Sequence, residues 1–307
     1  MKNLQTAVIG AGLMGHGIAL TLARSGQYVA VTDPMAEARA ALPARVADSL
    51  RLMGMSDADT AHILKRIEVF DTVPDAVRDA AFVFEAAPEK MALKQAIFAE
   101  VEANAPASAV LCSNTSVMPI TQIMAGLGDK SRALGTHWWN PPHLIPLVEV
   151  IRTADTSDMA MDAVMALLTE AGKTPVRVEK DVPGFIGNRL QHALWREAIS
   201  LVERGICDAA AVDAVVKASF GRRLAVLGPL ENADLVGTDL TLDIHNTVLA
   251  DLEDRRGPSP LLQEMVAAGR LGMKSGEGFQ TWTPDEARAL REKVTRHLMK
   301  LDTILEH

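Results

Sequence analysis

The sequence lacks the features that mark secreted, membrane or metal-binding proteins. Its 307 residues include two cysteines, Cys112 and Cys207, which are too few for a disulfide framework and match no metal or redox spacing. No apolar run reaches the roughly 18 residues of a membrane span. The opening MKNLQTAVIG carries one lysine and is unlike a secretory signal. We therefore expect no membrane contact and a reducing, cytoplasmic location.

Positive charge is scarce as well. Lysine and arginine number 31 against 39 aspartates and glutamates, which gives a net charge of -8 and a pI near 5.5. We expect no nucleic-acid partner, because phosphates require a clustered basic face and the sequence has none. A small-molecule substrate is still compatible, since a small anion needs only a few local donors. The 48% apolar and 23% charged residues are typical of a globular protein, and the length predicts two domains.

Residues 1–180 show the pattern of an α/β domain. Short apolar runs alternate with longer amphipathic stretches, which is typical of βαβ units and a parallel sheet. The predicted strands are QTAVIG, YVAVTD, AFVFEA, AVLCS, RALGTH, LVEVI and TPVRV. Helices are predicted over 13–25, 89–103 and 156–171, with a long helical region between the second and third strands.

From residue 181 onward the pattern is helical only. A helix is predicted to begin near Pro183, with Asp181 as its N-cap and Gly205 at its end. Further helices are predicted over 209–219, 230–253 and 285–305. We therefore expect an α/β domain with a parallel sheet over residues 1–180, followed by an all-α domain over residues 181–307.

A glycine-rich turn follows the first predicted strand. The stretch GAGLMG places Gly10, Gly12 and Gly15 in the order GxGxxG and opens a helix. The first glycine makes a tight turn, the second lets a pyrophosphate approach the backbone, and the third lets helix and strand pack closely. The helix N-terminus supplies unpaired amides to the phosphates. We predict that this turn binds NAD and includes Leu13 and Met14 in the site; the alternative is a structural turn.

The second predicted strand ends in Asp33. A carboxylate at this position can accept hydrogen bonds from both ribose hydroxyls and repels a 2′-phosphate, so it favours NAD over NADP. The alternative is an N-cap for the following helix, placed just before Pro34.

Three polar clusters lie where predicted strands end, and ligands of a doubly wound sheet bind beyond the C-terminal ends of its strands. Glu85 and Glu89 follow AFVF, the stretch 113–116 (SNTS) follows AVLC, and His137 follows RALGT. We expect these clusters to face one crevice together with the nicotinamide, with Asn114 among the cofactor contacts. The alternatives are a helix start, a capped turn and a simple strand end.

His137 is the predicted general base. Oxidation of an alcohol releases a hydride and a proton, and imidazole suits the proton transfer because its ordinary pKa lies near the working pH. Glu149, a charge between valines in LVEVI, is predicted to orient the imidazole; the alternative is a solvent-facing strand position. A metal site on His137 and His143 is not predicted, because their spacing matches no ligand pattern and no third ligand is near in sequence.

Seven motifs, in order along nearly the whole chain, resemble those of the NAD-dependent L-3-hydroxyacyl-CoA dehydrogenase family. They are GAGLMGHGIA, AAPEKMALK, SNTSVMPIT, THWWNPPHLIPLVEVI, DVPGFIGNRL, GPLENADLVG and GRLGMKSGEGF. The resemblance implies a Rossmann-like N-terminal domain with NAD as cofactor, and a helical C-terminal domain that forms a homodimer.

The resemblance also implies roles for particular residues. The family's catalytic pair and its two contacts to the substrate oxygen fall, in that order, on His137, Glu149, Ser116 and Asn188. Its further cofactor contacts fall on Asp33, Glu89 and Lys94, which favours Glu89 over Glu85. The implied reaction is hydride transfer between substrate and nicotinamide, with the histidine taking the hydroxyl proton.

Two departures from the family pattern bear on the substrate. Members that use CoA thioesters usually carry lysines between the second and third strands, whereas the stretch 52–64 (LMGMSDADTAHIL) has two aspartates and no lysine or arginine. Those members commonly read HFFNPVP where this chain reads HWWNPPHLIP. This form is more similar to the branch of the family that acts on free hydroxy compounds.

The pair Trp138-Trp139 is therefore of interest for the substrate. With Asn140, these residues are predicted to line the substrate pocket, where flat side chains could stack on a ring; the alternative is core packing under the loop. The sequence thus predicts an NAD-dependent dehydrogenase acting on a hydroxyl, or a hydrated aldehyde, near a carboxylate of a small molecule without CoA. The alternatives are an L-3-hydroxyacyl-CoA dehydrogenase and a non-catalytic NAD-binding or structural protein.

Overall fold

A computed structural model describes residues 5–305, and the chain divides into two compact units, Met1–Arg189 and Leu190–His307. The predicted boundary near residue 180 lies earlier than this division. The segment 181–189 stays with the first unit because its polar groups hydrogen-bond there, as described below. Among residues 5–305, no helix is long and apolar enough to cross a bilayer.

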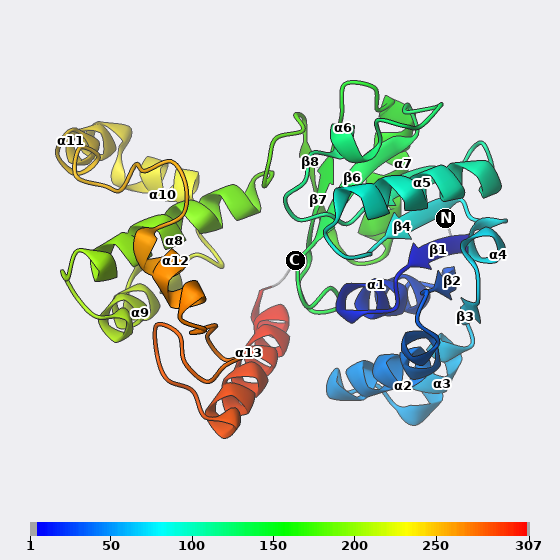
Figure 1. The fold of residues 1–307 in the computed structure, drawn as a ribbon, viewed down its shortest axis with the longest axis horizontal. Coiled ribbons are helices and arrows are strands. Elements are labelled where there is room, and N and C mark those ends of the chain that lie inside the picture. Colours follow the sequence, from blue (N-terminus) through cyan, green and yellow to red (C-terminus); the bar gives the residue numbers. More distant parts are fainter. Residues whose placement is uncertain (1–4, 306–307) are drawn as a thin grey trace. The chain divides into compact units, whose positions relative to one another are not determined.

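The first unit contains one eight-stranded sheet in the order β3-β2-β1-β4-β5-β6-β7-β8 (Figure 1). Its strands are β1 (Gln5–Ile9), β2 (Tyr28–Thr32), β3 (Ile67–Phe70), β4 (Phe82–Glu85), β5 (Val110–Ser113), β6 (Ala133–Trp138), β7 (Leu147–Ile151) and β8 (Thr174–Val178). All neighbouring pairs are parallel except β6 and β7, which run antiparallel. The predicted α/β class with a largely parallel sheet is confirmed.

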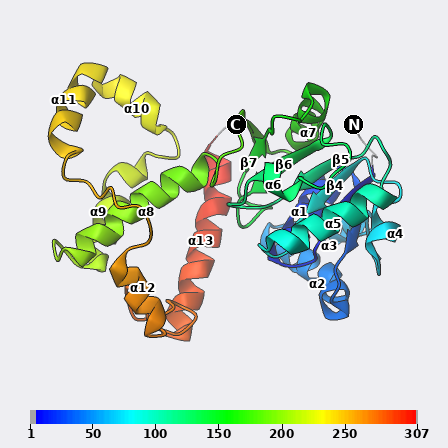
Figure 2. The same cartoon turned by 45° about the horizontal axis from the view of Figure 1, so that its top comes forward.

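Helices cover both faces of this sheet. They are α1 (Leu13–Arg24), α2 (Ala36–Leu52), α3 (Asp57–Leu64), α4 (Val73–Val77), α5 (Met91–Asn104), α6 (Ile120–Ile123) and α7 (Asp158–Glu170). Successive strand residues point to opposite faces, so Val8 packs in a core with α1, α2, α3 and α7, whereas Ala7 packs in a second core with α4, α5 and α6. Figure 2 gives a second view of the sheet and of the helices around it.

The long helical region predicted between the second and third strands contains α2, α3 and α4, but it also contains the strand β3, so the prediction is wrong at β3. β3 is a four-residue strand at the edge of the sheet with partly exposed side chains, and α4 is a five-residue helix capped by Thr72. A short strand at the edge of a sheet pairs with a neighbour along one side only, and its two faces are only partly covered. Its sequence therefore shows little of the apolar alternation that would predict a strand.

The second unit is helical, as predicted. Its helices are α8 (Gly187–Glu203, which begins in the first unit), α9 (Ala209–Ala218), α10 (Pro229–Val236), α11 (Thr238–Val248), α12 (Pro260–Ala267) and α13 (Pro284–Ile304). The predicted single helix over 230–253 is wrong, because the chain breaks between α10 and α11 at Gly237, whose φ is +100°. Glycine adopts this left-handed conformation without the steric cost that a side chain adds.

The second unit buries little of itself. Among its described residues only Ser200, Met265 and Ala287 are buried within this chain. Large apolar side chains on α10 and α11 are instead exposed, among them Leu230, Leu235, Leu240, Leu242 and Ile244. This much uncovered apolar surface is unusual for a monomeric soluble protein.

The segment before α8 is not helical, which corrects the predicted helix start near Pro183. α8 begins at Gly187, after a turn in which Phe185 has a φ of +51°. The Asp181 carboxylate does not cap α8. It accepts the backbone amides of Ile120, at 3.1 Å, and Thr121, at 2.7 Å, and so caps the first turn of α6. Asp181 therefore ties the end of the sheet domain to α6.

Candidate active site

The glycine turn after β1 has a distinct reason for each of its three glycines. Gly10 has a φ of +108°, and a Cβ there would lie 2.8 Å from the carbonyl oxygen of Ala86. A Cβ on Gly15 would lie 1.7 Å from the carbonyl oxygen of Gly10, so neither position admits a side chain. A Cβ on Gly12 would meet no protein atom within 4 Å. The space in front of Gly12 is therefore open to a ligand, as a pyrophosphate site requires.

The first turn of α1 adds hydrogen-bond donors to this space. α1 begins at Leu13, and its N-cap residue Gly12 has no side chain to satisfy the first amides. The amides of Leu13 and Met14 are among the groups that a helix N-terminus leaves for an anion. The predicted cofactor residues of the turn thus come together at one helix end.

Asp33, at the end of β2, holds the glycine turn in place. Its Oδ2 accepts the amide of Ala11 at 2.8 Å, and its Oδ1 accepts the amide of Met35 at 2.9 Å. The N-cap of α2 is Met35, so the alternative of Asp33 as that N-cap is wrong. Each carboxylate oxygen has capacity for a further hydrogen bond, which a ribose hydroxyl could use.

His137 and Glu149 face each other across β6 and β7. The antiparallel register pairs these two residues directly, and the imidazole Nδ1 lies 2.7 Å from the Glu149 Oε2. Directly opposed residues in an antiparallel pair share one face of the sheet. Both are buried, with exposed fractions of 4% and 1%. Glu149 is thus not at a solvent-facing position, and the contact that the sequence predicts is present.

The second oxygen of Glu149 binds the backbone before α8. Oε1 accepts the amides of Ile186, at 2.8 Å, and Gly187, at 3.0 Å. Burial by itself would raise the pKa of the Glu149 carboxyl, but the hydrogen bonds from His137 and from these two amides outweigh it and hold the pKa below its usual value. An ionised Glu149 can only accept, so the Nδ1–H of His137 donates to it, and Nε2 is the imidazole nitrogen left for a substrate.

Two aromatic rings flank the His137 imidazole. The ring centroid of Trp139 lies 5.2 Å away and that of Phe185 lies 5.6 Å away. Trp139 also packs on the start of α8, because a Cβ on Gly187 would lie 2.4 Å from its Cζ2 atom. The structure therefore places Trp139 next to the predicted base.

The other two predicted pocket residues lie elsewhere. Trp138 is 2% exposed and packs in the core against Phe84, so its position fits the core-packing alternative. Lys173 Nζ lies 5.6 Å from the Trp138 ring centroid. Asn140 is exposed and is followed by a cis peptide bond to Pro141.

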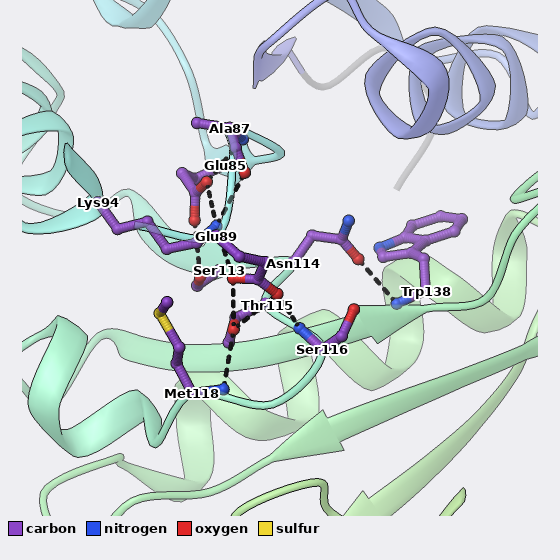
Figure 3. Close-up of polar contacts among 10 residues, drawn as sticks. All are labelled: Glu85, Ala87, Glu89, Lys94, Ser113, Asn114, Thr115, Ser116, Met118 and Trp138. Atoms are coloured by element: carbon purple, nitrogen blue, oxygen red, sulfur yellow. Dashed lines mark hydrogen bonds and ion pairs between the residues drawn. The ribbon is translucent and has the colours of Figure 1, made fainter. Parts of the chain in front are cut away.

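The loop after β5 carries the predicted Ser116 and Asn114 (Figure 3). The Asn114 Oδ1 accepts the amide of Trp138 at 2.9 Å, which ties the loop to β6. Asn188, in the first turn of α8, donates from Nδ2 to the carbonyl oxygen of Ser116 at 2.8 Å. Ser116, Asn188, Glu149 and His137 are thus joined by a short path of hydrogen bonds and neighbouring residues in the first unit.

Glu89 and Glu85 follow β4 but have different surroundings (Figure 3). Glu89 accepts the amide of Ser116 at 2.5 Å and the Thr115 hydroxyl at 2.9 Å. Glu85 is fully buried, which corrects the expectation that it faces the crevice. Its carboxylate pairs with the Lys94 ammonium, and the Lys94 side chain is fully buried as well. The predicted cofactor residue Lys94 therefore lies behind Glu89 in the interior.

Other candidate reactive groups lie apart from this arrangement. Burial, followed by the neighbouring His16 and Lys173, lowers the pKa of His143 to about 4. Burial raises the pKa of the Cys112 thiol, which makes a thiolate there unfavourable. Within residues 5–305, no group of three or more histidine, cysteine, aspartate or glutamate side chains is placed to hold a metal ion.

Two contacts to the site could not be predicted from residue types alone. The amides of Ile186 and Gly187 on Glu149 are backbone groups, which every residue except proline carries. Phe185 lies within the motif DVPGFIGNRL, and the glycine before it signals an unusual turn, but not that the ring meets His137.

The fold and the site together define a dinucleotide-dependent dehydrogenase. A family model for the NAD binding domain of 3-hydroxyacyl-CoA dehydrogenase matches residues 5–182, and one for the C-terminal domain of the same enzyme matches residues 184–282. The chain belongs to the 3-hydroxyacyl-CoA dehydrogenase family, and it is an NAD-dependent enzyme.

Individual relatives differ in their named substrates. The chain is 36% identical over 302 residues to a 5-formyl-3-hydroxy-2-methylpyridine 4-carboxylate 5-dehydrogenase of Mesorhizobium japonicum, covering 98% of this chain and 97% of that one. It is 38% identical over 284 residues to a probable 3-hydroxybutyryl-CoA dehydrogenase of Bacillus subtilis, covering 91% and 97%. A solved structure of a 5-formyl-3-hydroxy-2-methylpyridine 4-carboxylic acid 5-dehydrogenase, an NAD+-dependent dismutase, superimposes with a TM-score of 0.91 at 34% identity, covering 99% of both chains.

Proposed function

We propose that this enzyme oxidises a hydroxyl group, or a hydrated aldehyde, close to a carboxylate on a small substrate that carries no CoA. The observation that carries the reaction is the buried pair of His137 and Glu149, with Nδ1 and Oε2 2.7 Å apart. The likeness to the Mesorhizobium japonicum pyridine carboxylate dehydrogenase over nearly the full length of both chains supports the substrate class.

The charge of the arm between β2 and β3 also supports a substrate without CoA. In the stretch 52–64 the exposed Asp57 and Asp59 lie in the first turn of α3. The preceding arginine, Arg51, lies within 4 Å of the carboxylates of Asp48 and Asp57. Exposed carboxylates repel phosphate groups, so the stretch 52–64 offers poor contacts to the phosphates of CoA.

The proton transfer follows from the two nitrogens of His137. Nδ1 donates to Glu149, so Nε2 has its lone pair free to take the hydroxyl proton. The ionised Glu149 then stabilises the imidazolium that forms. Bound NAD supplies the acceptor for the hydride that leaves the carbon atom bearing this hydroxyl. In the reverse direction the imidazolium returns the proton to the carbonyl oxygen.

The remaining predicted residues act on the substrate oxygen. In this proposal the Ser116 hydroxyl and the Asn188 amide group donate hydrogen bonds to the oxygen as it becomes a carbonyl. Asn188 uses one N–H on the Ser116 carbonyl, which leaves its second N–H for the substrate. The rings of Trp139 and Phe185, both close to the imidazole, exclude water from the reacting groups.

NADH formation from a panel of substrates tests this proposal. The panel holds free 3-hydroxy acids, aromatic carboxylates with a neighbouring hydroxymethyl or formyl group, and 3-hydroxybutyryl-CoA. We expect turnover of a free carboxylate with kcat/KM at least about tenfold above that of the thioester. Turnover of the thioester alone would contradict the substrate class and support the second candidate, a 3-hydroxyacyl-CoA dehydrogenase, which the similarity to the Bacillus subtilis protein favours.

A His137→Ala variant separates the enzyme from the third candidate, a non-catalytic NAD-binding protein. We expect the variant to lose about 100- to 10,000-fold in kcat and to keep its affinity for NADH, measured by fluorescence. Unchanged turnover would contradict the role of His137 as the base. His62→Ala, at an exposed position on α3, is the matched control.

We infer that the helical unit forms a homodimer. Its support is the apolar surface on α10 and α11, which this chain leaves uncovered, together with only three buried side chains among the described residues of the unit. Sedimentation velocity should show a dimer for the wild type. Leu242→Asp, at a position that is 61% exposed, should weaken it, whereas Met159→Asp on α7, which is 80% exposed, should not. A monomeric wild type would contradict the inference.

A further inference from the structure

Two aspartates follow neighbouring strands at one edge of the sheet. β2 and β3 are the two strands at that edge (Figure 1), they run parallel, and their register pairs Thr32 with Phe70. The next residues along the two strands are Asp33 and Asp71. Ligands of a doubly wound sheet bind beyond these C-terminal strand ends. Asp71 therefore lies beside the residue whose carboxylate is predicted to accept the ribose hydroxyls of NAD.

The guanidinium of Arg39 joins these two aspartates. Arg39, in the first turn of α2, donates from Nη1 to the backbone carbonyl oxygen of Asp33 at 2.6 Å and from Nη2 to the Asp71 Oδ1 at 2.8 Å. The Arg39 side chain is 18% exposed and the Asp71 side chain 85%. Both terminal nitrogens of the guanidinium are thus engaged next to the predicted ribose site.

The ion pair of Arg39 and Asp71 adds little to the stability of the fold. An exposed carboxylate stays hydrated, and salt screens its attraction to a cation. The effect of the pair is instead local, because it neutralises a cation beside the predicted ribose site. Together with Asp33, two carboxylates then stand against one guanidinium, so the three groups carry a net negative charge.

This charge bears on the choice between NAD and NADP. NADP differs only by a phosphate on the 2′-oxygen of the adenine ribose, and an arginine near the end of the second strand can accommodate that phosphate. Arginine binds phosphate through two parallel N–H groups. Arg39 is placed for this role, but Asp71 occupies one of its terminal nitrogens and offsets its charge. The two carboxylates also repel a phosphate.

We propose that Asp71 is a second determinant of cofactor choice beside Asp33, and that Arg39 is a latent binding residue for a 2′-phosphate. In the wild type, Asp71 holds the Arg39 guanidinium, so the site accepts NAD and rejects NADP. Without the Asp71 carboxylate, the same guanidinium becomes available to the phosphate. The proposal concerns the cofactor alone and does not depend on which substrate the enzyme oxidises.

Fluorescence titrations with NADH and NADPH test this proposal without any substrate. Asp71 is exposed, so Asp71→Asn should fold and melt like the wild type. We expect it to lower the Kd for NADPH about three- to tenfold and to change the Kd for NADH less than about twofold. The matched control is Asp48→Asn, which removes a carboxylate 2.8 Å from Arg51 in another exposed pair on α2. The control should leave both Kd values unchanged.

Adding Arg39→Met to Asp71→Asn identifies the group that binds the phosphate. If Arg39 binds it, the gain in NADPH affinity disappears in this double variant. A gain that persists would show that Asp71 acts by repulsion only, and would overturn the role of Arg39. The role of Asp71 would be overturned by an unchanged Kd for NADPH in Asp71→Asn, or by a Kd for NADH raised tenfold or more.

A combination with Asp33→Asn measures how the two aspartates share the discrimination. The asparagine oxygen can still accept the amide of Ala11, which Asp33 accepts at 2.8 Å, but the charge is gone. We expect Asp33→Asn with Asp71→Asn to bind NADPH about 10- to 100-fold more tightly than the wild type. Asp33→Asn alone should gain less, because Arg39 stays paired. Equal gains with and without Asp71→Asn would show that Asp33 alone sets the choice.

Discussion

Glu149 binds the imidazole of His137 through one carboxylate oxygen and keeps its other oxygen for the backbone before α8. The first contact, Oε2 to Nδ1, measures 2.7 Å, and the second oxygen receives two amides. The orientation of the base is therefore fixed relative to the turn that carries Phe185. Four predictions follow from this arrangement and from the packing around it.

Replacing Glu149 with glutamine should separate orientation from charge. The oxygen of the glutamine side chain can still accept the Nδ1–H, but a neutral side chain cannot stabilise the imidazolium. The NH2 group of the glutamine must also face either His137 or the two backbone amides, all of which are donors themselves. We expect kcat to fall about 100- to 1,000-fold with a small change in the KM for NAD. The control is Glu179→Gln, at an exposed position after β8. A loss below about threefold would mean that Glu149 does not assist proton transfer.

Adding a methyl group to Gly187 should disturb the base through Trp139. The new Cβ would lie 2.4 Å from the Trp139 Cζ2, so the indole must move away from its place beside His137. We expect Gly187→Ala to lower the free energy of unfolding by about 1–3 kcal/mol and to lower kcat as well. Gly126→Ala, where a Cβ meets no protein atom within 4 Å, is the control. Equal stability of both variants in thermal melts would contradict the contact.

Phe185 combines a strained backbone with a buried ring, and the two effects can be separated. Its φ of +51° costs about 1 kcal/mol for a residue with a side chain and much less for glycine. Loss of the ring costs about 3–5 kcal/mol, so both Phe185→Ala and Phe185→Gly should be destabilised. The glycine variant should nonetheless unfold at higher urea than the alanine variant, by about 1 kcal/mol in free energy. The reverse order would show that the turn relaxes in the variants.

The pKa of His143 should make stability depend on pH. Burial, with the charges nearby, lowers this pKa to about 4, whereas the unfolded chain titrates near 6.5. Between these values the unfolded chain binds a proton that the folded chain does not, so the free energy of unfolding falls as the pH drops from about 6.5 to 4. The loss is at most about 3 kcal/mol, and partial exposure of the ring reduces it.

Urea titrations between pH 4 and 7 check this effect. His143→Asn should flatten the dependence of stability on pH across that window, whatever its effect on stability at pH 7. His62→Asn, at an exposed position on α3, should keep the slope of the wild type. A wild-type slope that persists in His143→Asn would assign the proton uptake to another group.

The parts of this protein that the sequence predicts well are those with a local physical cause. Gly10 and Gly15 are glycines because no Cβ fits, so the turn after β1 and the start of α1 can be predicted from GAGLMG. The contact of Glu149 with His137 follows from a charge among valines, which requires a partner once the strand is buried. The catalytic role of this pair stays a prediction.

The parts that the sequence does not predict depend on distant contacts. Asp181 and Pro183 have the local pattern of a helix start, yet Asp181 caps α6, which lies 60 residues earlier in the chain. Glu85 and Glu89 are equivalent as a sequence pattern after β4. The Glu85 carboxylate is buried because it contacts Lys94 of α5 and Ser113 of β5, whereas the Glu89 carboxylate stays half exposed.

The antiparallel pairing of β6 with β7 has a consequence for how such enzymes change substrate. Strand register alone places Glu149 opposite His137, and residues 139–146 connect the two strands as a loop. Exchange of residues 140–146 for another segment of the same length retains Trp139 and should leave the register of the pair in place. A library confined to residues 140–146 would therefore test whether this connection sets substrate recognition, while the pair in the hairpin around it keeps its register.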